Sequence, residues 1–240
     1  MTVELLKSRK SVRVYTDKEI SAEDKNTILE CAVNAPTAGN QQLYTIIDVT
    51  DQEIKEKLVK TCDNQPFIAE AKIVLIFCAD CKKWYEGFKD MNCEPRDPGV
   101  GDLLLAVSDA NIAAQNAVIA AESLGIGSCY IGDIMENCEA QRELLGLPEY
   151  VFPAAMIVFG YPTQQQLDRE KPQRAPLDVI VSTNRYPKMD AEYRQKLFGY
   201  KAADGNYERW MKAFCDRKYN SDFSVEMTRS VNQYIKQFEK

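Results

Sequence analysis

The sequence predicts a mixed fold in which helices and a β-sheet share one hydrophobic core. Two short and continuously apolar runs, residues 72–79 and 154–161, are typical of strands buried on both faces. Between them lies a long helical stretch at 105–124, of about five and a half turns. From about residue 186 the strand patterns stop, and aromatic residues alternate with charges at helical spacing. With 240 residues, the chain can form one large domain or two small ones.

The helix at 105–124 is expected to be buried around most of its circumference. One face carries alanines at three- and four-residue steps, and the opposite stripe is polar but hardly charged. Polar residues interrupt the apolar run too often for a membrane span. Gly125 is expected to end the helix in a left-handed cap. The glycines of 127–133 would then let backbone amides approach a flat ligand, although a core helix with a capping turn explains this stretch equally well.

The other elements are predicted from local patterns, taken in chain order. Ser21 is a candidate N-cap for a helix that ends near residue 35, before the breaker-rich loop 36–42. A strand at 44–49, a surface helix at 51–60 and an amide-containing loop at 64–67 follow. A loop at 90–102, a short helix at 141–147 and an edge strand at 177–181 complete the pattern.

Composition excludes several classes of function. The net charge of −6, with no long basic block, disfavours nucleic acid as a partner. No basic segment followed by an apolar one marks a secretory signal, and eight scattered cysteines are typical of reduced thiols, so we expect a cytoplasmic protein. Cys78 and Cys81 form a lone CxxC, for which ordinary thiols are favoured over redox or metal chemistry. No metal site is expected.

The chain contains no histidine. This removes Ser-His and Cys-His catalysis and most catalytic zinc sites. An enzyme of this composition relies on carboxylates, Lys, Tyr or Cys, or on a cofactor. The glycines after residue 124 do not match GxGxxG and follow a helix instead of a strand, and no P-loop motif occurs.

The remaining polar groups are distributed along the chain. If residues 9–13 are extended, Arg9, Ser11 and Arg13 share one face and can cradle a phosphate, although a solvated basic segment is the simpler explanation of this motif alone. Amides follow at Asn40 and Gln65, with further cations near residues 171–174. Such a set suits a flat, singly phosphorylated ligand such as FMN, whose phosphate pairs with guanidiniums and whose pyrimidine edge pairs with amides.

Five segments resemble the FMN-dependent nitroreductase family in their order and spacing. They are SRKSVRVY, APTAGNQQ, NQPFIAEAKIVLIFCAD, DANIAAQNAVIAAESLGIGSCYIGD and KPQRAPLDVIVSTNRY, which together span residues 8–186. The tail segment FCDRKYNSDFSVEMTRSV resembles the branch that contains NADPH-type nitroreductases and FMN reductases. The resemblance implies an α+β fold with a central, mainly antiparallel sheet flanked by helices. It also implies an intertwined homodimer, with an FMN-binding core at 1–186 and a C-terminal helical arm at 187–240 that packs on the partner subunit.

The resemblance assigns roles to individual residues. Arg9 and Ser11, with Lys10 between them, match positions near the phosphate and ribityl chain. Arg13 matches a basic position at the N1/O2 edge of the flavin. Gln65 matches an amide that reads the pyrimidine edge.

Two further segments match family positions that approach the cofactor. Pro36, Thr37 and Asn40 match a loop that reaches FMN from the second subunit. Tyr130, Ile131, Gly132 and Asp133 match a segment that gives main-chain donors to the ring.

Two cations match the second half of the phosphate clamp. These are Lys171 and Arg174, and the family's usual Lys-x-Arg spacing is interrupted here by Gln173, so either cation alone can hold the phosphate. In the tail, Arg209, Arg217 and Lys218 are candidates for the 2′-phosphate of NADPH.

The resemblance implies an oxidoreductase in which hydride passes from NADPH or NADH to flavin N5 and then, in a ping-pong cycle, to an acceptor in the same slot. The expected acceptors are nitroaromatics, quinones or free flavin, and Arg13 would tune the flavin without any obligatory side-chain acid. The alternatives are a non-catalytic flavin store or redox sensor, and another reductive flavoenzyme on the same scaffold, such as a dehalogenase or a flavin-fragmenting enzyme.

Overall fold

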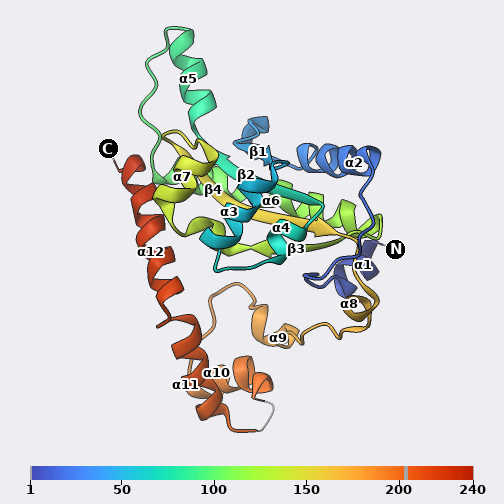
Figure 1. The fold of residues 1–240 in the computed structure, drawn as a ribbon. Coiled ribbons are helices and arrows are strands. Elements are labelled where there is room, and N and C mark those ends of the chain that lie inside the picture. Colours follow the sequence, from blue (N-terminus) through green and yellow to red (C-terminus); the bar gives the residue numbers. More distant parts are fainter. Residues whose placement is uncertain (1, 203–204, 240) are drawn as a thin grey trace. The chain divides into compact units, whose positions relative to one another are not determined.

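The computed structural model describes residues 2–202 and 205–239, which form two compact units. The first unit comprises Met1–Glu170 and Glu226–Lys240, and the second comprises Lys171–Val225. The first unit contains a four-stranded sheet of order β1-β2-β4-β3, in which every neighbouring pair is antiparallel (Figure 1). The predicted α+β class with an antiparallel sheet is therefore confirmed.

The sheet has its two most apolar strands in the centre. The strands are β1 (Tyr44–Asp48), β2 (Ile73–Asp80), β3 (Gly127–Ile131) and β4 (Val151–Gly160). Every residue of β2 and β4 is buried, as their continuous apolar runs predict. Sequence analysis did not predict a strand at 127–131, but these residues form the edge strand β3. Its glycine and small polar residues conceal the strand pattern, and pairing with β4 overrides the weak local propensity.

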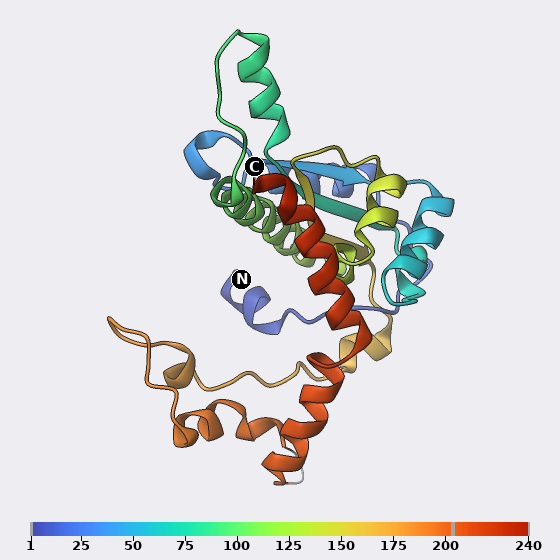
Figure 2. The same ribbon diagram turned by 90° about the vertical axis from the view of Figure 1, so that its left-hand side faces the viewer.

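Helices cover both faces of this sheet. On one face α2 (Ala22–Val33) and α6 (Val100–Ser123) pack against alternate residues of β2, including Leu75 and Phe77. On the other face α3 (Gln52–Thr61), α4 (Phe67–Glu70) and α7 (Cys138–Leu145) enclose a second cluster. Figure 2 shows α6 running along its face of the sheet. The helices predicted at 21–35, 51–60, 105–124 and 141–147 are confirmed, with shifted ends.

The alanine-rich face of α6 is the centre of the first core cluster. Ten of its residues are buried, and six alanines among them have no exposed surface: Ala106, Ala110, Ala113, Ala114, Ala117 and Ala121. The helix begins earlier than predicted, at Val100, because Asp102 Oδ2 accepts the Gly99 N–H at 2.8 Å and caps the first turn. Gly125 follows the helix with φ of 74°, as predicted. By length and composition α6 can cross a membrane, but half of its most apolar window is buried inside the protein, as in a core helix.

The opposite side of α6 carries exposed apolar residues within this single chain. Leu104 is 62% exposed, Leu105 52% and Ile112 40%. Neighbouring exposed positions carry uncharged polar side chains. An apolar stripe of this kind on a buried helix is typical of a surface that another molecule covers.

The structure adds short elements that the sequence did not predict. Residues at the start form α1 (Thr2–Ser8), so the chain is extended only from residue 9. The helix α5 (Lys82–Asp90) contains Gly87, a weak helix former. It stands out beyond the end of the sheet (Figures 1 and 2). The remaining short elements of the first unit are η1 (Ala38–Asn40), η2 (Gly132–Met135), α8 (Gln164–Asp168) and η4 (Lys236–Phe238).

The second unit contains only helices among its described residues. The edge strand predicted at 177–181 is wrong, because Leu177–Ile180 forms the short helix α9. Pro176 at the N-cap starts this turn, and no strand of the same unit is available to pair with a β-branched run. The helical pattern predicted for the tail is confirmed by α10 (Ala191–Phe198), η3 (Gly199–Lys201), α11 (Tyr207–Lys218) and α12 (Asp222–Ile235).

The end of α12 and the residues after it belong to the first unit and complete its core. Tyr234 packs edge-on against Phe152 with ring centroids 5.1 Å apart. Phe238 packs in the same way against Tyr150 at 5.4 Å. The chain end therefore stabilises the core around β4.

Candidate functional site

The basic segment 9–13 runs along the outer edge of β3. Val12 N–H donates to Ser128 O at 2.9 Å, and Ser11 forms a parallel bridge with Ser128. A Cβ on Gly127 would lie 2.5 Å from Val12 Cγ2, so only glycine permits this approach. The role of Gly127 is thus to seat the basic segment, which differs from the ligand contact that the sequence suggested.

Neighbouring cations in this segment have different surroundings. Lys10 Nζ donates to the carbonyls of Leu167, at 2.6 Å, and Arg169. By contrast, Arg9 Nη1 is buried and has no hydrogen-bond partner among residues 2–202 and 205–239. A buried donor without an acceptor costs free energy. Arg9 is therefore the residue of this segment best prepared to receive an anion.

The segment after β4 holds residues 9–13 in place. Gln166, only 7% exposed, accepts the Arg13 N–H on its Oε1 at 3.2 Å. The Arg169 guanidinium donates to Ser11 O, and Lys10 returns a bond to Arg169 O. Sequence analysis missed both Gln166 and Arg169, since only the amide- and charge-rich composition of 164–176 indicated them.

Arg13 lies over Phe67, which directly follows the loop that carries Gln65. The Arg13 guanidinium carbon lies 5.9 Å from the centroid of the Phe67 ring. Phe67 begins α4, two residues after Gln65. The structure thus places the exposed charge of Arg13 beside the Gln65 loop.

The Gln65 carboxamide is held by two acceptor oxygens. Its Nε2 donates to Cys62 O at 2.9 Å and to Asp133 Oδ2 at 2.5 Å. The backbone makes this possible because Asp63 and Asn64 both adopt positive φ, of 57° and 52°, and reverse the chain after α3. The side chain of Asp133 is therefore directed to Gln65, while its predicted ligand contact was through the main chain.

Glu136 lies behind this pair and is only 3% exposed. Burial, the charge of Asp133 and a hydrogen bond with Asp133 raise the pKa of Glu136 to about 8. Its Oε1 has no hydrogen-bond partner among the described residues. At neutral pH the Glu136 carboxyl therefore carries a proton beside Asp133.

The end of β3 uses its side chains for the protein's own structure. Tyr130 donates its hydroxyl to Gln115 Oε1 of α6 at 3.1 Å, and burial raises the pKa of Tyr130 to about 12 against the opposing charge of Arg9. Ile131 is 2% exposed and packs in the core. Beyond it, nothing lies within 4 Å of the Cβ position of Gly132. The segment therefore leaves its main chain at Gly132 open to a ligand.

The loop 36–42 is fixed to α6 by a buried carboxylate, Asp109, which is 3% exposed. Asp109 accepts the Thr37 hydroxyl, the Ala38 N–H at 3.0 Å and the Leu43 N–H at 3.2 Å. Thr37 is engaged in this way inside the chain, whereas Pro36 and Asn40 are exposed. Sequence analysis missed Asp109, although an acid in the middle of an alanine-rich helix was a visible signal.

Lys171 and Arg174 belong to the second unit, and each unit is described by itself. Within that unit Arg174 Nη1 donates to Pro172 O at 3.2 Å. Of the three tail candidates, Arg217 and Lys218 lie over aromatic rings, with the Arg217 guanidinium 5.4 Å from the Phe214 centroid. Lys218 Nζ lies 5.1 Å from the ring of Phe223.

The CxxC cysteines lie on opposite faces of the sheet. Cys78 belongs to the cluster under α3 and Cys81 to the cluster under α6. Burial raises the pKa of each thiol to about 12, so neither is a thiolate at neutral pH. This geometry agrees with ordinary structural thiols. The described residues contain no group of three His, Cys, Asp or Glu side chains that could hold a metal ion.

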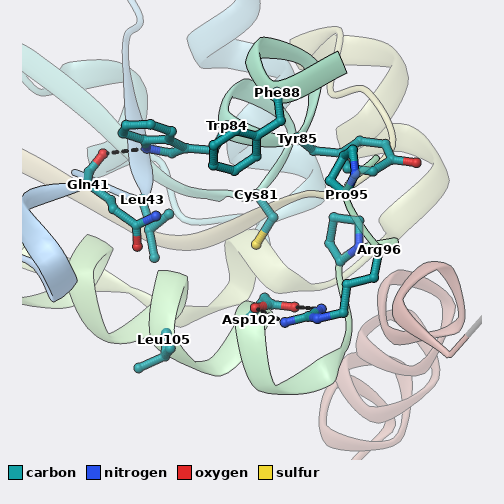
Figure 3. A pocket seen from close by; sticks show the side chains of 11 residues that line it. Gln41, Leu43, Cys81, Trp84, Tyr85, Phe88, Pro95, Arg96, Asp102 and Leu105 are labelled. Carbon is teal, nitrogen blue, oxygen red and sulfur yellow. Dashed lines mark hydrogen bonds and ion pairs between the residues drawn. The ribbon is translucent and has the colours of Figure 1, made fainter. Parts of the chain in front are cut away.

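Figure 3 shows an aromatic pocket of about 280 Å³ between α5 and the start of α6. Trp84 and Phe88 form one wall, with ring centroids 5.7 Å apart. The Arg96 guanidinium and the Asp102 carboxylate form a two-point ion pair on the opposite side, at 2.6 and 2.9 Å. Because Trp84 Nε1 donates to Gln41 O at 2.8 Å, the pocket adjoins the loop 36–42. Sequence analysis did not predict this pocket.

The sequence profile of the nitroreductase family matches residues 6–161. The chain belongs to the nitroreductase family. It is 32% identical over 235 residues to the FMN reductase (NAD(P)H) of Bacillus subtilis, covering 97% of this chain and 90% of that protein. It is also 32% identical to the oxygen-insensitive NADPH nitroreductase of Salmonella typhimurium, covering 87% and 85%. The solved NfrA1 nitroreductase from B. subtilis has a TM-score of 0.86 and 27% identity, covering 99% and 98% of the two chains.

The residues of this chain that match the family profile all lie in its first unit. Segment 9–13, the loop 36–42, Gln65 and the end of β3 all lie inside residues 6–161. Lys171 and Arg174 lie beyond the matched residues, although the two full-length similarities extend over them.

Proposed function

We propose that this nitroreductase is an FMN-dependent NAD(P)H oxidoreductase that reduces flat, electron-poor acceptors in a ping-pong cycle. Its relatives are named as an FMN reductase and an NADPH nitroreductase. When bound, FMN supplies the hydride chemistry, which protein side chains do not provide. The observation that carries the proposal is the buried Arg9 donor without a described partner, in a segment whose Lys10 side chain and main chain are hydrogen-bonded.

The donor set of the first unit fits FMN. Arg9 Nη1 is a cationic donor for a phosphate, and Arg169 and Lys10 hold the surrounding backbone rigid. Gln65 offers a carboxamide oxygen to a pyrimidine edge. Gly132 gives open main chain to a planar ring. In this proposal Lys171 and Arg174 supply the second half of the phosphate clamp.

Arg13 has the role of stabilising negative charge on the reduced ring. Its guanidinium is exposed and lies over Phe67 beside the Gln65 loop. A fixed cation at that edge favours the anionic form of a ligand and so favours reduction. No side-chain proton donor is required, because water supplies protons.

The active form in this proposal is a homodimer. The exposed apolar stripe of α6, with Leu104, Leu105 and Ile112, is the surface that a second copy covers. The loop 36–42 then reaches the partner's cofactor through Pro36, Thr37 and Asn40, and the arm 187–240 packs on the partner. A cytoplasmic location agrees with eight free thiols.

The acceptors in this proposal are nitroaromatics, quinones or free flavin. The pocket formed by Trp84 and Phe88 supports this class, because aromatic walls bind planar molecules by stacking. Its link to the loop 36–42 through Gln41 places it next to the part of the chain that would approach the partner's site.

Steady-state kinetics test this proposal. Initial rates are measured with NADPH and a nitroaromatic varied together, using FMN-loaded protein and, as a control, protein stripped of flavin. The proposal predicts parallel double-reciprocal lines, flavin-dependent turnover, and a reduction half-reaction that slows about tenfold or more in Arg13→Ala while flavin is partly retained. Intersecting lines would overturn the ping-pong cycle, and a flavin-loaded protein without turnover would indicate a flavin store.

A further inference from the structure

The Gln65 carboxamide can face a ligand with either its oxygen or its nitrogen, and the two choices select different ligands. An outward oxygen accepts a hydrogen bond from a ring N–H, whereas an outward nitrogen donates to a ring carbonyl or an unprotonated ring nitrogen. The two orientations are nearly isosteric, so the surrounding hydrogen-bond partners decide between them.

Both partners of Gln65 in this structure are obligate acceptors. One is the main-chain oxygen of Cys62, at 2.9 Å, and the other is Oδ2 of Asp133, at 2.5 Å. Each takes one of the two hydrogens on Nε2. A flipped carboxamide would bring its oxygen against a carbonyl and a carboxylate, and neither of them can donate. Oε1 is therefore the atom that remains to accept a hydrogen bond from a ligand.

Of the two anchors, only Asp133 is a side chain. The Cys62 carbonyl belongs to the C-cap of α3 and is present whatever side chain follows. Asp133 lies in η2, directly after the open main chain of Gly132. A charged acceptor makes a stronger bond than a neutral one, so the carboxylate dominates the orientation.

Glu136 supports this arrangement from behind. It is 3% exposed and lies close enough to Asp133 for a carboxyl hydrogen bond. Asp63 and Glu226 also face Glu136, and their charges favour its protonated form. Oδ2 of Asp133 is the oxygen that accepts the Gln65 Nε2 hydrogen bond.

We propose that Asp133 is a positioning residue that turns the Gln65 nitrogen inward, so that the site selects a planar ring bearing an N–H opposite Gln65 Oε1. This inference rests on the proposed function, in which that ring is the pyrimidine part of FMN. It assigns to the Asp133 side chain a role distinct from the main-chain contact expected of the same residue.

The test compares FMN with its N3-methyl analogue, in which the ring N–H is replaced by a methyl group. Dissociation constants for both are measured by flavin fluorescence on the stripped full-length protein, its Asp133→Ala and Asp133→Asn variants, and Glu56→Gln as a control. Glu56 is an exposed carboxylate on the neighbouring helix α3. We expect the parent and Glu56→Gln to prefer FMN by about tenfold or more, the effect of one good hydrogen bond, and both Asp133 variants to lose most of that preference.

A preference for FMN that is unchanged in both Asp133 variants would overturn the inference.

A second experiment needs no bound flavin. It follows the Gln65 side-chain amide of the flavin-free protein by nuclear magnetic resonance, and so tests the inference even if the variants bind no flavin. The two Gln65 side-chain hydrogens, assigned by their loss in Gln65→Leu, should both be protected from solvent exchange in the parent, and one should lose protection in Asp133→Asn. Equal protection in the parent and Asp133→Asn would also overturn it. A parent protein that binds neither flavin but shows the protected amide would refute the proposed function and leave the Gln65 orientation intact.

Discussion

Gly127 lies so close to Val12 that a Cβ at Gly127 would come within 2.5 Å of Val12 Cγ2. This approach seats the segment carrying Arg9, Ser11 and Arg13 against β3. The Gly127→Ala substitution should displace that segment, since overpacking at a rigid contact costs about 1–3 kcal/mol. We expect a lower melting temperature and FMN binding weakened by about tenfold, measured by thermal unfolding and flavin titration. Gly87→Ala is the control, because nothing lies within 4 Å of its Cβ position. Equal flavin affinity in the two variants would contradict this account.

Arg9 and Lys10 should respond in opposite ways to substitution by methionine. Arg9→Met removes a buried donor that has no described partner, so the flavin-free protein should keep its stability or gain some, while FMN affinity falls by about ten- to a hundredfold. Lys10→Met removes bonds to Leu167 O and Arg169 O, so it should destabilise the flavin-free protein. Denaturant unfolding and flavin titration of both variants measure these effects. An Arg9→Met protein that is less stable without flavin but binds it normally would show that Arg9 is structural.

Asp109 should determine the order of the loop 36–42. The Asp109→Asn variant keeps the volume but replaces a carboxylate that accepts three donors with an amide that has one acceptor oxygen. A loss of about 2–3 kcal/mol in unfolding free energy is expected, because buried donors lose a charged acceptor. Limited proteolysis should then cut within the loop. Unchanged stability and an intact loop would mean that Asp109 does not anchor it.

Sequence patterns predicted the parts of this protein that local periodicity determines. β2 and β4 follow from continuous apolar runs, and α6 follows from its alanine spacing. β3 escaped prediction because its pairing with β4, rather than its residue types, makes it a strand. The run at 177–181 shows the opposite case. Its β-branched residues predicted a strand, but their unit offers no partner strand, and residues 177–180 form a helix.

The candidate site shows the same division between local and tertiary information. Arg9, Arg13 and Gln65 were predicted from motifs, as were Asn40 and Gly132. Gln166 and Arg169 could not be predicted, because their importance comes from contacts with residues more than 150 positions away. The side-chain bond between Gln65 and Asp133 joins residues 68 positions apart, which only the fold brings together.

Glu136 should make stability depend on pH. Its pKa is raised from 4.5 to about 8 by burial, by Asp133 and by the charges of Asp63 and Glu226. A carboxyl with a raised folded-state pKa stabilises the protein fully below its ordinary pKa, and this contribution is lost as pH rises to the folded value. The stability of the parent relative to Glu136→Gln should therefore fall between about pH 4.5 and about pH 8, and then level off. Denaturant unfolding across this range checks the prediction, and parallel profiles for the two proteins would refute it.

The exposed stripe of α6 should mediate dimerisation. Leu105 is 52% exposed, and Leu105→Glu places a charge on the surface proposed to meet the second copy. Sedimentation should show a dimer for the parent and dissociation for the variant, with flavin lost in parallel. Met91→Glu, at a residue 74% exposed and outside the stripe, should remain dimeric. A monomeric parent with full flavin content would exclude the proposed dimer.

The central claim is that residues of this chain bind FMN and that NAD(P)H reduces it. Anaerobic absorption spectroscopy of the flavin-loaded protein tests it most directly. NADPH or NADH should bleach the visible flavin absorbance, and a nitroaromatic or quinone added afterwards should restore it. A protein that takes up no FMN when offered it, or a bound flavin that neither nicotinamide nucleotide bleaches, would contradict the account.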